Sequence, residues 1–337
     1  MQVSSDAHRF FEGKKILVTG GGGFIGSHLV ETLVKTGARV RAFVRYNSRA
    51  DPGLLAFLPP EISSEVEILS GDLRDYDAVS QAMRGASILF HLGALISIPY
   101  SYLHPVEVVE TNVMGALNIL MAARENGIER IVHTSSSEVY GTAITVPISE
   151  SHPLQGQSPY SASKIGADKL AESFYCAYQV PVVILRPFNT YGPRQSARAV
   201  IPTIICQALT RDYLQLGNLE ARRDFTYVAD TVSGFLLAAR VPGIEGQTFN
   251  LGVGSDVSIG NLAREIIQLI GRPVEIRLDQ QRLRPEKSEV MRLISDNRLA
   301  RERMGWSPVV DLQTGLGHTI GWIEQHLNRY RPDLYQV

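Results

Sequence analysis

The segment at 14–27 reads KKILVTGGGGFIGS and places an apolar strand directly before a glycine-rich turn and the start of a helix. Glycines with GxxGxxG spacing allow a tight turn, let the backbone approach a pyrophosphate, and bring helix and strand together. Amide groups at the helix start can then bind phosphate. We therefore expect a dinucleotide at this turn. Its expected contacts are Gly20, Gly23, Phe24, Ile25 and Gly26.

Outward from this turn, apolar β-branched runs alternate with segments of helical periodicity. Alternation of this kind implies parallel βαβ units, so the sequence predicts an α/β fold with a doubly wound parallel sheet of the Rossmann type. The stretch after the fourth strand, up to Val106, is expected to be a loop. The expected strands are 16–18, 40–44, 66–69, 88–92, 131–133 and 182–185, and the expected helices are 25–35, 77–83, 106–125 and 160–178.

The rhythm changes after Pro187, where a loop rich in Pro, Gly and Asn at 189–196 leads into a mixed region. There we expect helices near 199–210, 229–240 and 258–270 and strands near 214–217 and 247–252. The predicted domains are a dinucleotide-binding domain at 1–187, rejoined at about 225–248, and a smaller mixed α/β substrate lobe at 188–224 and 249–337.

The composition excludes several classes of protein. Hydrophobic residues make up 44% and charged residues 20%, which is typical of a globular protein. The 33 Lys and Arg residues are balanced by 34 Asp and Glu residues, so no overall positive charge attracts nucleic acid or an anionic membrane. Cys176 and Cys206 lack zinc-ligand spacing, and the N-terminal segment lacks the apolar run of a secretory signal. We expect a cytoplasmic protein with no metal, nucleic-acid or membrane partner.

The end of the second strand bears on the identity of the dinucleotide. An acid at this place usually binds the adenosine ribose of NAD, but the sequence has Arg45. An arginine suits the 2′-phosphate of NADP, although it can also stack on adenine, so NADP is preferred and NAD stays open. Further cofactor contacts are expected from Asn47, Ser48 and Arg49, from Asp72 at the adenine edge with Leu73, and from Leu92 and Ala94.

The segment SPYSASK at 158–164 combines helix-start residues with a candidate base. Ser158 as N-cap and Pro159 in the first turn start a helix, so Tyr160 and Lys164 lie one turn apart on one face. A lysine ammonium beside a phenol favours the phenolate, which makes Tyr160 a candidate general base. The YxxxK pattern occurs often by chance, and its position after the fifth strand of this chain gives it weight.

The fifth strand ends in SSSEVYG at 135–141, a hydroxyl-rich segment with one carboxylate. Ligands of doubly wound sheets bind beyond the carboxyl ends of the strands. Ser136 is therefore a candidate hydrogen-bonding group and Glu138 a candidate catalytic carboxylate, although a Ser-rich strand end can also be a plain turn.

These segments, together with RPFNTYGPRQSARAVIP at 186–202 and RRDFTYVAD at 222–230, resemble the extended short-chain dehydrogenase/reductase family of nucleotide-sugar epimerases and dehydratases. Within it, the chain looks most like bacterial 4,6-dehydratases of nucleotide-linked hexoses or N-acetylhexosamines, of the legionaminic-acid-pathway type. The resemblance implies a Ser136, Tyr160 and Lys164 triad, Pro187 beside the nicotinamide, Asn189 near the sugar diphosphate, and Arg223 and Arg284 as diphosphate clamps.

One departure from the family pattern affects the expected reaction. The best-known 4,6-dehydratases have Thr-Asp-Glu where this chain has Ser136, Ser137 and Glu138, and there the Asp protonates the leaving 6-hydroxyl. Serine is a poor proton donor and cannot take over the role of the Asp as an acid. We therefore expect Ser137 or an ordered water only to relay that proton. A 4-epimerase and a nucleotide-hexuronate decarboxylase stay alternatives, as does a catalytically dead dinucleotide sensor, against which the presence of both Tyr160 and Lys164 argues.

The resemblance also implies a tightly bound dinucleotide that is recycled within each turnover, and a homodimer. In this family, helices equivalent to 106–125 and 160–178 of two subunits form a four-helix bundle. Both segments are long here and carry apolar residues on more than one face, as a helix buried on two sides should.

Overall fold

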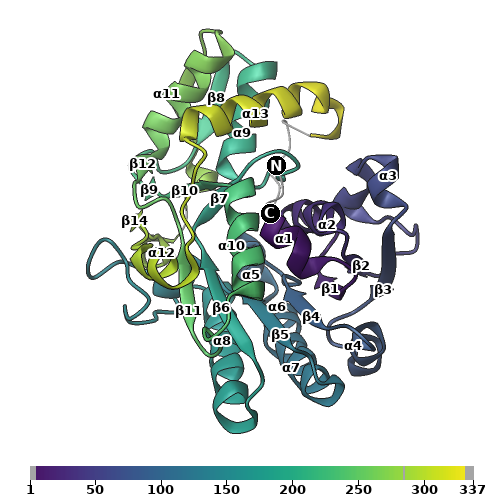
Figure 1. The fold of residues 1–337 in the computed structure, drawn as a ribbon. Helices are drawn as coiled ribbons and strands as arrows, with labels where there is room; N and C mark the ends of the chain where they lie inside the picture. Colours follow the sequence, from purple (N-terminus) through teal and green to yellow (C-terminus); the bar gives the residue numbers. More distant parts are fainter. Residues whose placement is uncertain (1–4, 284, 331–337) are drawn as a thin grey trace.

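A seven-stranded parallel sheet forms the centre of the computed structural model, which describes residues 5–283 and 285–330 (Figure 1). The strand order is β11-β6-β5-β4-β1-β2-β3, so the chain reverses direction across the sheet between β1 and β4. Ligands of such sheets bind at this switch point, beyond the carboxyl ends of the strands. The strands are β1 (Lys15–Thr19), β2 (Arg39–Arg45), β3 (Val66–Gly71), β4 (Ile88–His91), β5 (Arg130–Thr134), β6 (Val182–Pro187) and β11 (Thr248–Leu251).

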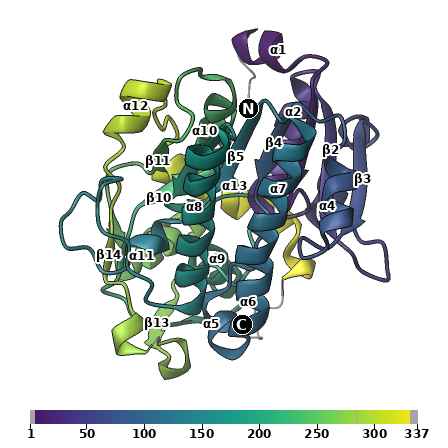
Figure 2. The ribbon, with the colours of Figure 1, turned by 90° about the horizontal axis from the view of Figure 1, so that it is seen from below.

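Helices cover both faces of the sheet, which confirms the predicted α/β class (Figures 1 and 2). Ile16 and Val18 of β1 face one core, and Leu17 between them faces the other, so the strand reads as an unbroken apolar run. One core is covered by α1 (Ser5–Phe11), α2 (Phe24–Lys35) and α10 (Val228–Arg240), the other by α4 (Tyr76–Met83), α7 (Gly115–Asn126) and α8 (Pro159–Tyr178).

The helix expected at 106–125 is present as three joined parts, which are α6 (Pro105–Val109), a π-helical turn (Glu110–Met114) and α7. By length and composition alone, the continuous helix Pro105–Asn126 could cross a membrane. Its apolar window is 44% buried within the chain, and α7 packs against α4 and α8 as one of the helices that cover the sheet. We therefore interpret it as a core helix with one uncovered side.

A second lobe lies beside the carboxyl ends of the strands and has a core of its own, with Ile204, Leu214, Leu262 and Leu316 fully buried. The division of the chain into a dinucleotide domain and a substrate lobe remains our proposal. The lobe contains α9 (Val200–Thr210), β8 (Tyr213–Leu216), β9 (Arg222–Arg223), β12 (Val257–Ser258), α11 (Ile259–Ile270), β13 (Glu275–Leu278), β14 (Arg292–Leu293) and α13 (Leu312–Gln325), while α12 (Arg298–Met304) packs against β11.

Two segments expected to be loops contain regular structure. The segment after β4 holds α5 (Ile98–Leu103), because the Ser97 hydroxyl accepts the Tyr100 amide at 3.3 Å and Pro99 suits the first turn. The segment after Pro187 begins with β7 (Asn189–Tyr191), which pairs in parallel with β10 (Phe225–Tyr227). The loop predictions were wrong there because a local cap and a distant partner strand outweighed composition.

An aromatic contact joins the dinucleotide side to the C-terminal helix. The chain after β2 forms a 3₁₀ turn (Gly53–Phe57), where the Leu54 amide donates to the Gly22 carbonyl at 2.9 Å. The Phe57 ring then lies 5.5 Å from the Trp322 ring of α13 and 4.3 Å below the Arg329 guanidinium. The segment that closes over the glycine turn is therefore held by the other lobe.

Candidate active site

A cavity of about 1240 Å³ lies between the glycine turn, the carboxyl ends of the strands and the second lobe. Ser48, Asp72, Leu73, Ser137 and Lys164 do not form part of its wall, and Arg284 lies outside the described residues. The predicted site residues that do line it are Gly20, Gly23, Phe24, Ile25, Gly26, Arg45, Asn47, Arg49, Leu92, Ala94, Ser136, Glu138, Tyr160, Pro187, Asn189 and Arg223.

The glycine turn is too crowded for side chains. Gly20 has φ +68°, and a Cβ there would lie 2.8 Å from the Gly93 nitrogen, while a Cβ at Gly26 would lie 2.2 Å from the Gly20 carbonyl oxygen. Helix α2 begins with Gly23 as N-cap and has no side-chain cap, so its first amides remain available to an anion. The turn therefore fits the pyrophosphate of a nicotinamide dinucleotide.

Directly after β3, Asp72 is held differently from the expectation. The Arg74 guanidinium donates to its carboxylate at 2.7 Å and keeps the pKa of Asp72 below its ordinary value. Leu73 does not line the cavity but packs against Gly93, which does: a Cβ added at Gly93 would lie 2.7 Å from Leu73 Cδ1. For the predicted contact with the adenine edge, the Asp72 carboxylate would have to bind Arg74 and the adenine at the same time.

The candidate base Tyr160 is 6% exposed and lines the cavity together with Ser136 and Glu138. Burial raises the pKa of Tyr160 to about 12, although a hydrogen bond with Ser136 opposes that shift. The Lys164 amine donates to the Thr134 carbonyl at 2.6 Å, and burial lowers the pKa of Lys164 to about 8. The expected lowering of the Tyr160 pKa by Lys164 is not seen in this structure, because burial of the phenol dominates.

Asp168 connects these groups, and sequence reasoning missed it. It lies on α8 one turn beyond Lys164, with its carboxylate fully buried. The carboxylate accepts the Ser135 hydroxyl at 2.7 Å and the Arg186 guanidinium at 3.1 and 3.2 Å, and its second oxygen lies 3.4 Å from His133 Nε2. The spacing of 160, 164 and 168 on one helix face was the only local sign of it.

The buried network continues across the sheet from Arg186. Its guanidinium donates to the Tyr140 hydroxyl at 3.0 Å, and that hydroxyl donates to Asn250 of β11 at 2.7 Å. Tyr140 belongs to the 3₁₀ turn Ser137–Tyr140, which also carries Glu138. The network therefore fixes the turn that presents the candidate carboxylate.

The predicted clamp Arg223 lines the cavity from β9 and is 7% exposed. Its guanidinium lies 3.5 Å from the Glu289 carboxylate, which also lines the cavity and was not predicted. The neighbouring Asp224 accepts the amides of Val253, Gly254 and Ser295 at 2.8 to 3.0 Å, which anchors the strand end next to Arg223. Burial raises the pKa of Asp224 to about 6.

Comparison with known proteins assigns the chain to a family. The family model described as GDP-mannose 4,6 dehydratase matches residues 17–319. The chain is 30% identical to dTDP-D-glucose 4,6-dehydratase of Mus musculus, with 94% of this chain and 91% of that protein covered. It is 34% identical to UDP-glucose 4-epimerase of Mycolicibacterium smegmatis, with 91% and 97% covered.

A solved structure of dTDP-glucose 4,6-dehydratase from Streptomyces venezuelae, which holds NAD, superposes with a TM-score of 0.83 at 28% identity, covering 94% of this chain and 99% of that one. The chain therefore belongs to the extended short-chain dehydrogenase/reductase family. It is a nicotinamide-dependent enzyme of the nucleotide-sugar dehydratase and epimerase class. The relatives also include a UDP-glucuronic acid decarboxylase, so at this identity the family does not fix the reaction.

Replacement of Asp168 tests the buried network. Asp168→Asn leaves Arg186 without its anion, and breaking a buried pair in this way costs about 3–5 kcal/mol in the free energy of unfolding. Glu172→Gln on the same helix, where Glu172 pairs with Lys169 at the surface, should cost less than about 1 kcal/mol. Urea unfolding of both variants at equal protein concentration measures the difference, and equal losses would contradict a special role for Asp168.

Proposed function

We propose that the enzyme is a nucleotide-sugar 4,6-dehydratase that converts an NDP-hexose or NDP-N-acetylhexosamine into the 4-keto-6-deoxy sugar. The observation that supports this most directly is the shared cavity wall of Tyr160 and Glu138, which offers a proton acceptor on α8 and a second one at the end of β5. Two acceptors suit a reaction that removes protons from two positions of one sugar ring.

The chemistry that we propose begins at the sugar 4-hydroxyl. A bound nicotinamide dinucleotide supplies the hydride acceptor at C4 and, later, the hydride donor at C6. Tyr160 Oη takes the proton of the 4-hydroxyl, with Ser136 holding the same oxygen. Because burial sets the pKa of Tyr160 at about 12, this step needs a nearby cation, and we assign that role to Lys164, one helical turn away.

The second proton leaves from C5, which the 4-ketone has made acidic. Glu138 takes this proton while the C6–O bond breaks, and the departing hydroxyl receives the proton that Tyr160 took from the 4-hydroxyl and leaves as water. Ser137 is 4% exposed and outside the cavity wall, so our proposal gives the relay of that proton to an ordered water. Glu138 then returns a proton to C5 as hydride reaches C6, which completes the 4-keto-6-deoxy sugar.

Arg223 and Asn189, which both line the cavity, are proposed to hold the sugar diphosphate. A guanidinium donates two parallel hydrogen bonds to a phosphate, which suits Arg223 to this role. Arg284 is proposed as a second clamp from its sequence. A cytoplasmic location, expected from the N-terminal sequence, also stays a proposal.

A panel of UDP-, GDP-, CDP- and dTDP-sugars, analysed by mass spectrometry, separates the three reactions known among the relatives. We expect loss of one water from a hexose or N-acetylhexosamine substrate. Loss of carbon dioxide from a hexuronate would identify a decarboxylase, and conversion at unchanged mass would identify a 4-epimerase. Either of those results alone across the panel would overturn the dehydratase proposal.

Glu138→Gln tests the proposed base. The variant should still oxidise C4 but should not exchange the C5 proton with solvent deuterium, and turnover should fall by roughly 10²–10⁴-fold. Tyr160→Phe provides the comparison, since it should retain the dinucleotide yet lose C4 oxidation. Full C5 exchange in Glu138→Gln, measured by NMR, would show that another residue is the base.

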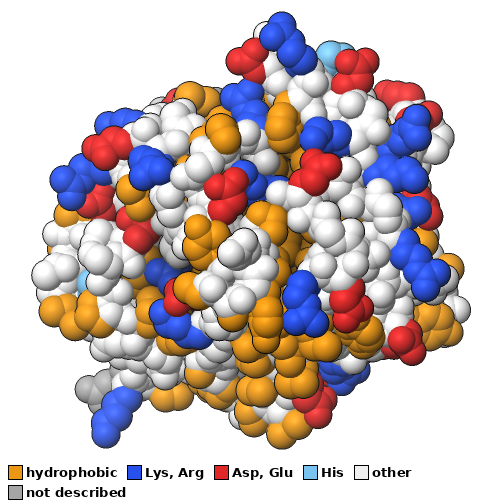
Figure 3. Space-filling view, turned by 60° about the horizontal axis from the view of Figure 1, so that its bottom comes forward, with side chains coloured by type: hydrophobic (Ala, Val, Ile, Leu, Met, Phe, Trp, Pro, Cys, Tyr) orange, Lys and Arg blue, Asp and Glu red, His pale blue; other side chains and the backbone are white. Residues whose placement is uncertain are grey.

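We also propose a homodimer in which α6, α7 and α8 of two copies form a four-helix bundle. Side chains of this face remain uncovered in the single chain, with Val106 69%, Val109 44% and Met114 48% exposed. Figure 3 shows hydrophobic side chains gathered on the face over these helices. Exposed apolar patches of this kind mark association surfaces.

Light scattering tests the dimer, because a single chain has a mass of 37.1 kDa. Val109→Glu with Met114→Glu should shift the protein to the monomer, since each buries a charge in the proposed interface. Val309→Glu is the matched control, because Val309 is 84% exposed and lies outside these helices. A wild-type monomer at micromolar concentration would refute the bundle.

A further inference from the structure

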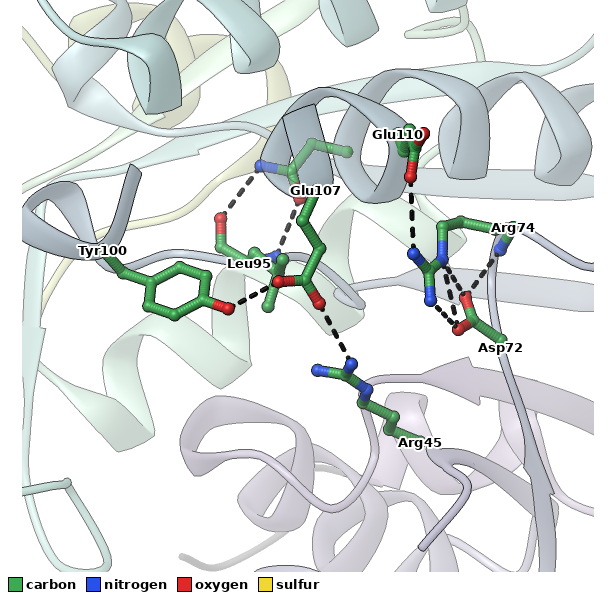
Figure 4. A network of polar contacts seen from close by, with 8 residues as sticks. Arg45, Asp72, Arg74, Leu95, Tyr100, Glu107 and Glu110 are labelled. Atoms are coloured by element: carbon green, nitrogen blue, oxygen red, sulfur yellow. Dashed lines mark hydrogen bonds and ion pairs between the residues drawn. The ribbon is translucent and has the colours of Figure 1, made fainter. Parts of the chain in front are cut away.

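A carboxylate from a helix meets the arginine at the end of β2. Arg45 Nη2 lies 3.1 Å from Glu107 Oε1, and the Tyr100 hydroxyl donates to Glu107 Oε2 at 2.5 Å (Figure 4). Glu107 occupies the first turn of α6, where the helix dipole also favours a negative charge. The Tyr100 hydroxyl and then Arg45 keep the pKa of Glu107 below its ordinary value, so this carboxylate is ionised near neutral pH.

A second ion-pair group lies beside the first. Arg74 binds the Asp72 carboxylate at 2.7 Å and Glu110, one turn beyond Glu107 along the same helix, at 3.4 Å (Figure 4). The two guanidinium groups at this corner are thus outnumbered by three carboxylates. These two ion-pair groups together carry a negative formal charge, although Arg45 considered alone suggests a positive one.

We infer that Glu107 makes the dinucleotide site prefer NAD over NADP. The end of β2 is where the adenosine ribose of a bound dinucleotide lies in this fold, and Arg45 lines the cavity there. A 2′-phosphate brings a charge of about −1.5 to −2. It would have to displace Glu107 from Arg45 and stay beside the displaced carboxylate, whereas a free ribose hydroxyl can donate to a carboxylate.

This inference rests on the proposed dinucleotide site and reverses the sequence-based preference for NADP. The expected acid is absent from β2, and a carboxylate 62 residues later in the chain takes its place. Arg45 is 66% exposed and Glu107 26%, so solvent and salt screen the pair. The expected preference is therefore modest, roughly tenfold at low ionic strength.

The experiment measures dinucleotide affinity in the absence of sugar. Purified protein is denatured and its retained NAD and NADP are quantified by chromatography; protein freed of dinucleotide is then titrated with each form by calorimetry at low salt. Wild type should retain NAD and bind NAD more tightly than NADP. Glu107→Gln, which keeps the size of the side chain and releases Arg45, should raise the NADP-to-NAD affinity ratio roughly tenfold.

Two further variants separate Glu107 from a general charge effect. Glu110→Gln removes the same charge one helical turn away, from a side chain that pairs with Arg74 and not with Arg45. It should change the logarithm of the NADP-to-NAD affinity ratio by less than half as much as Glu107→Gln does. Arg45→Ala combined with Glu107→Gln should abolish the gain in NADP affinity. A wild-type preference for NADP, an unchanged ratio in Glu107→Gln, or equal shifts in Glu107→Gln and Glu110→Gln would overturn the inference.

Because no sugar is present, these results are independent of whether the enzyme is a dehydratase, an epimerase or a decarboxylase. Failure of both dinucleotides to bind wild-type protein would refute the dinucleotide site, and with it the inference. Binding of both forms with equal affinity would refute the role of Glu107 and leave the proposed reaction untouched.

Discussion

The buried carboxylate of Asp168 determines how the candidate catalytic groups are placed. A fully buried anion is tolerated only when hydrogen bonds and a counter-ion replace the water it has lost, and Ser135 and Arg186 supply them. These partners lie at the ends of β5 and β6, so satisfying one carboxylate sets the position of α8 against both strands. Tyr160 and Lys164 lie on that helix and have little freedom to shift.

Charged groups behave differently around Tyr160 and around Arg45. At the candidate catalytic groups, burial moves the pKa of Tyr160 upward and that of Lys164 downward, so burial disfavours the charged form of both side chains. Near the end of β2, the pairs Arg45–Glu107 and Arg74–Asp72 are exposed and screened, so the discrimination between dinucleotides that we propose there would not carry the energetic cost of burial. The molecule thus combines buried candidate catalytic groups with solvated ion pairs beside the proposed dinucleotide site.

The parts of this molecule that were predictable are those encoded by neighbouring residues. The glycine turn, the alternating strands and helices, and the Tyr160 and Lys164 spacing are all local patterns. Asp168 was missed because an aspartate on a helix is ordinarily exposed, and only the arrival of Arg186 explains its burial. Glu107 and Phe57 were missed for the same reason, since each acquires its meaning from a partner far along the chain.

Strand β6 pairs with β11, a strand that comes after much of the second lobe in the sequence. The sheet is therefore complete only when this later part of the chain is present. Strand β11 begins at Thr248, and the residues between β6 and β11 include β7, α9, β8 and α10. During synthesis the edge of β6 therefore stays open until Thr248–Leu251 has emerged from the ribosome, and an open edge can pair with other chains. Asn250, which accepts the Tyr140 hydroxyl, arrives with the same strand, so the polar network under the active site is completed only when this edge is closed.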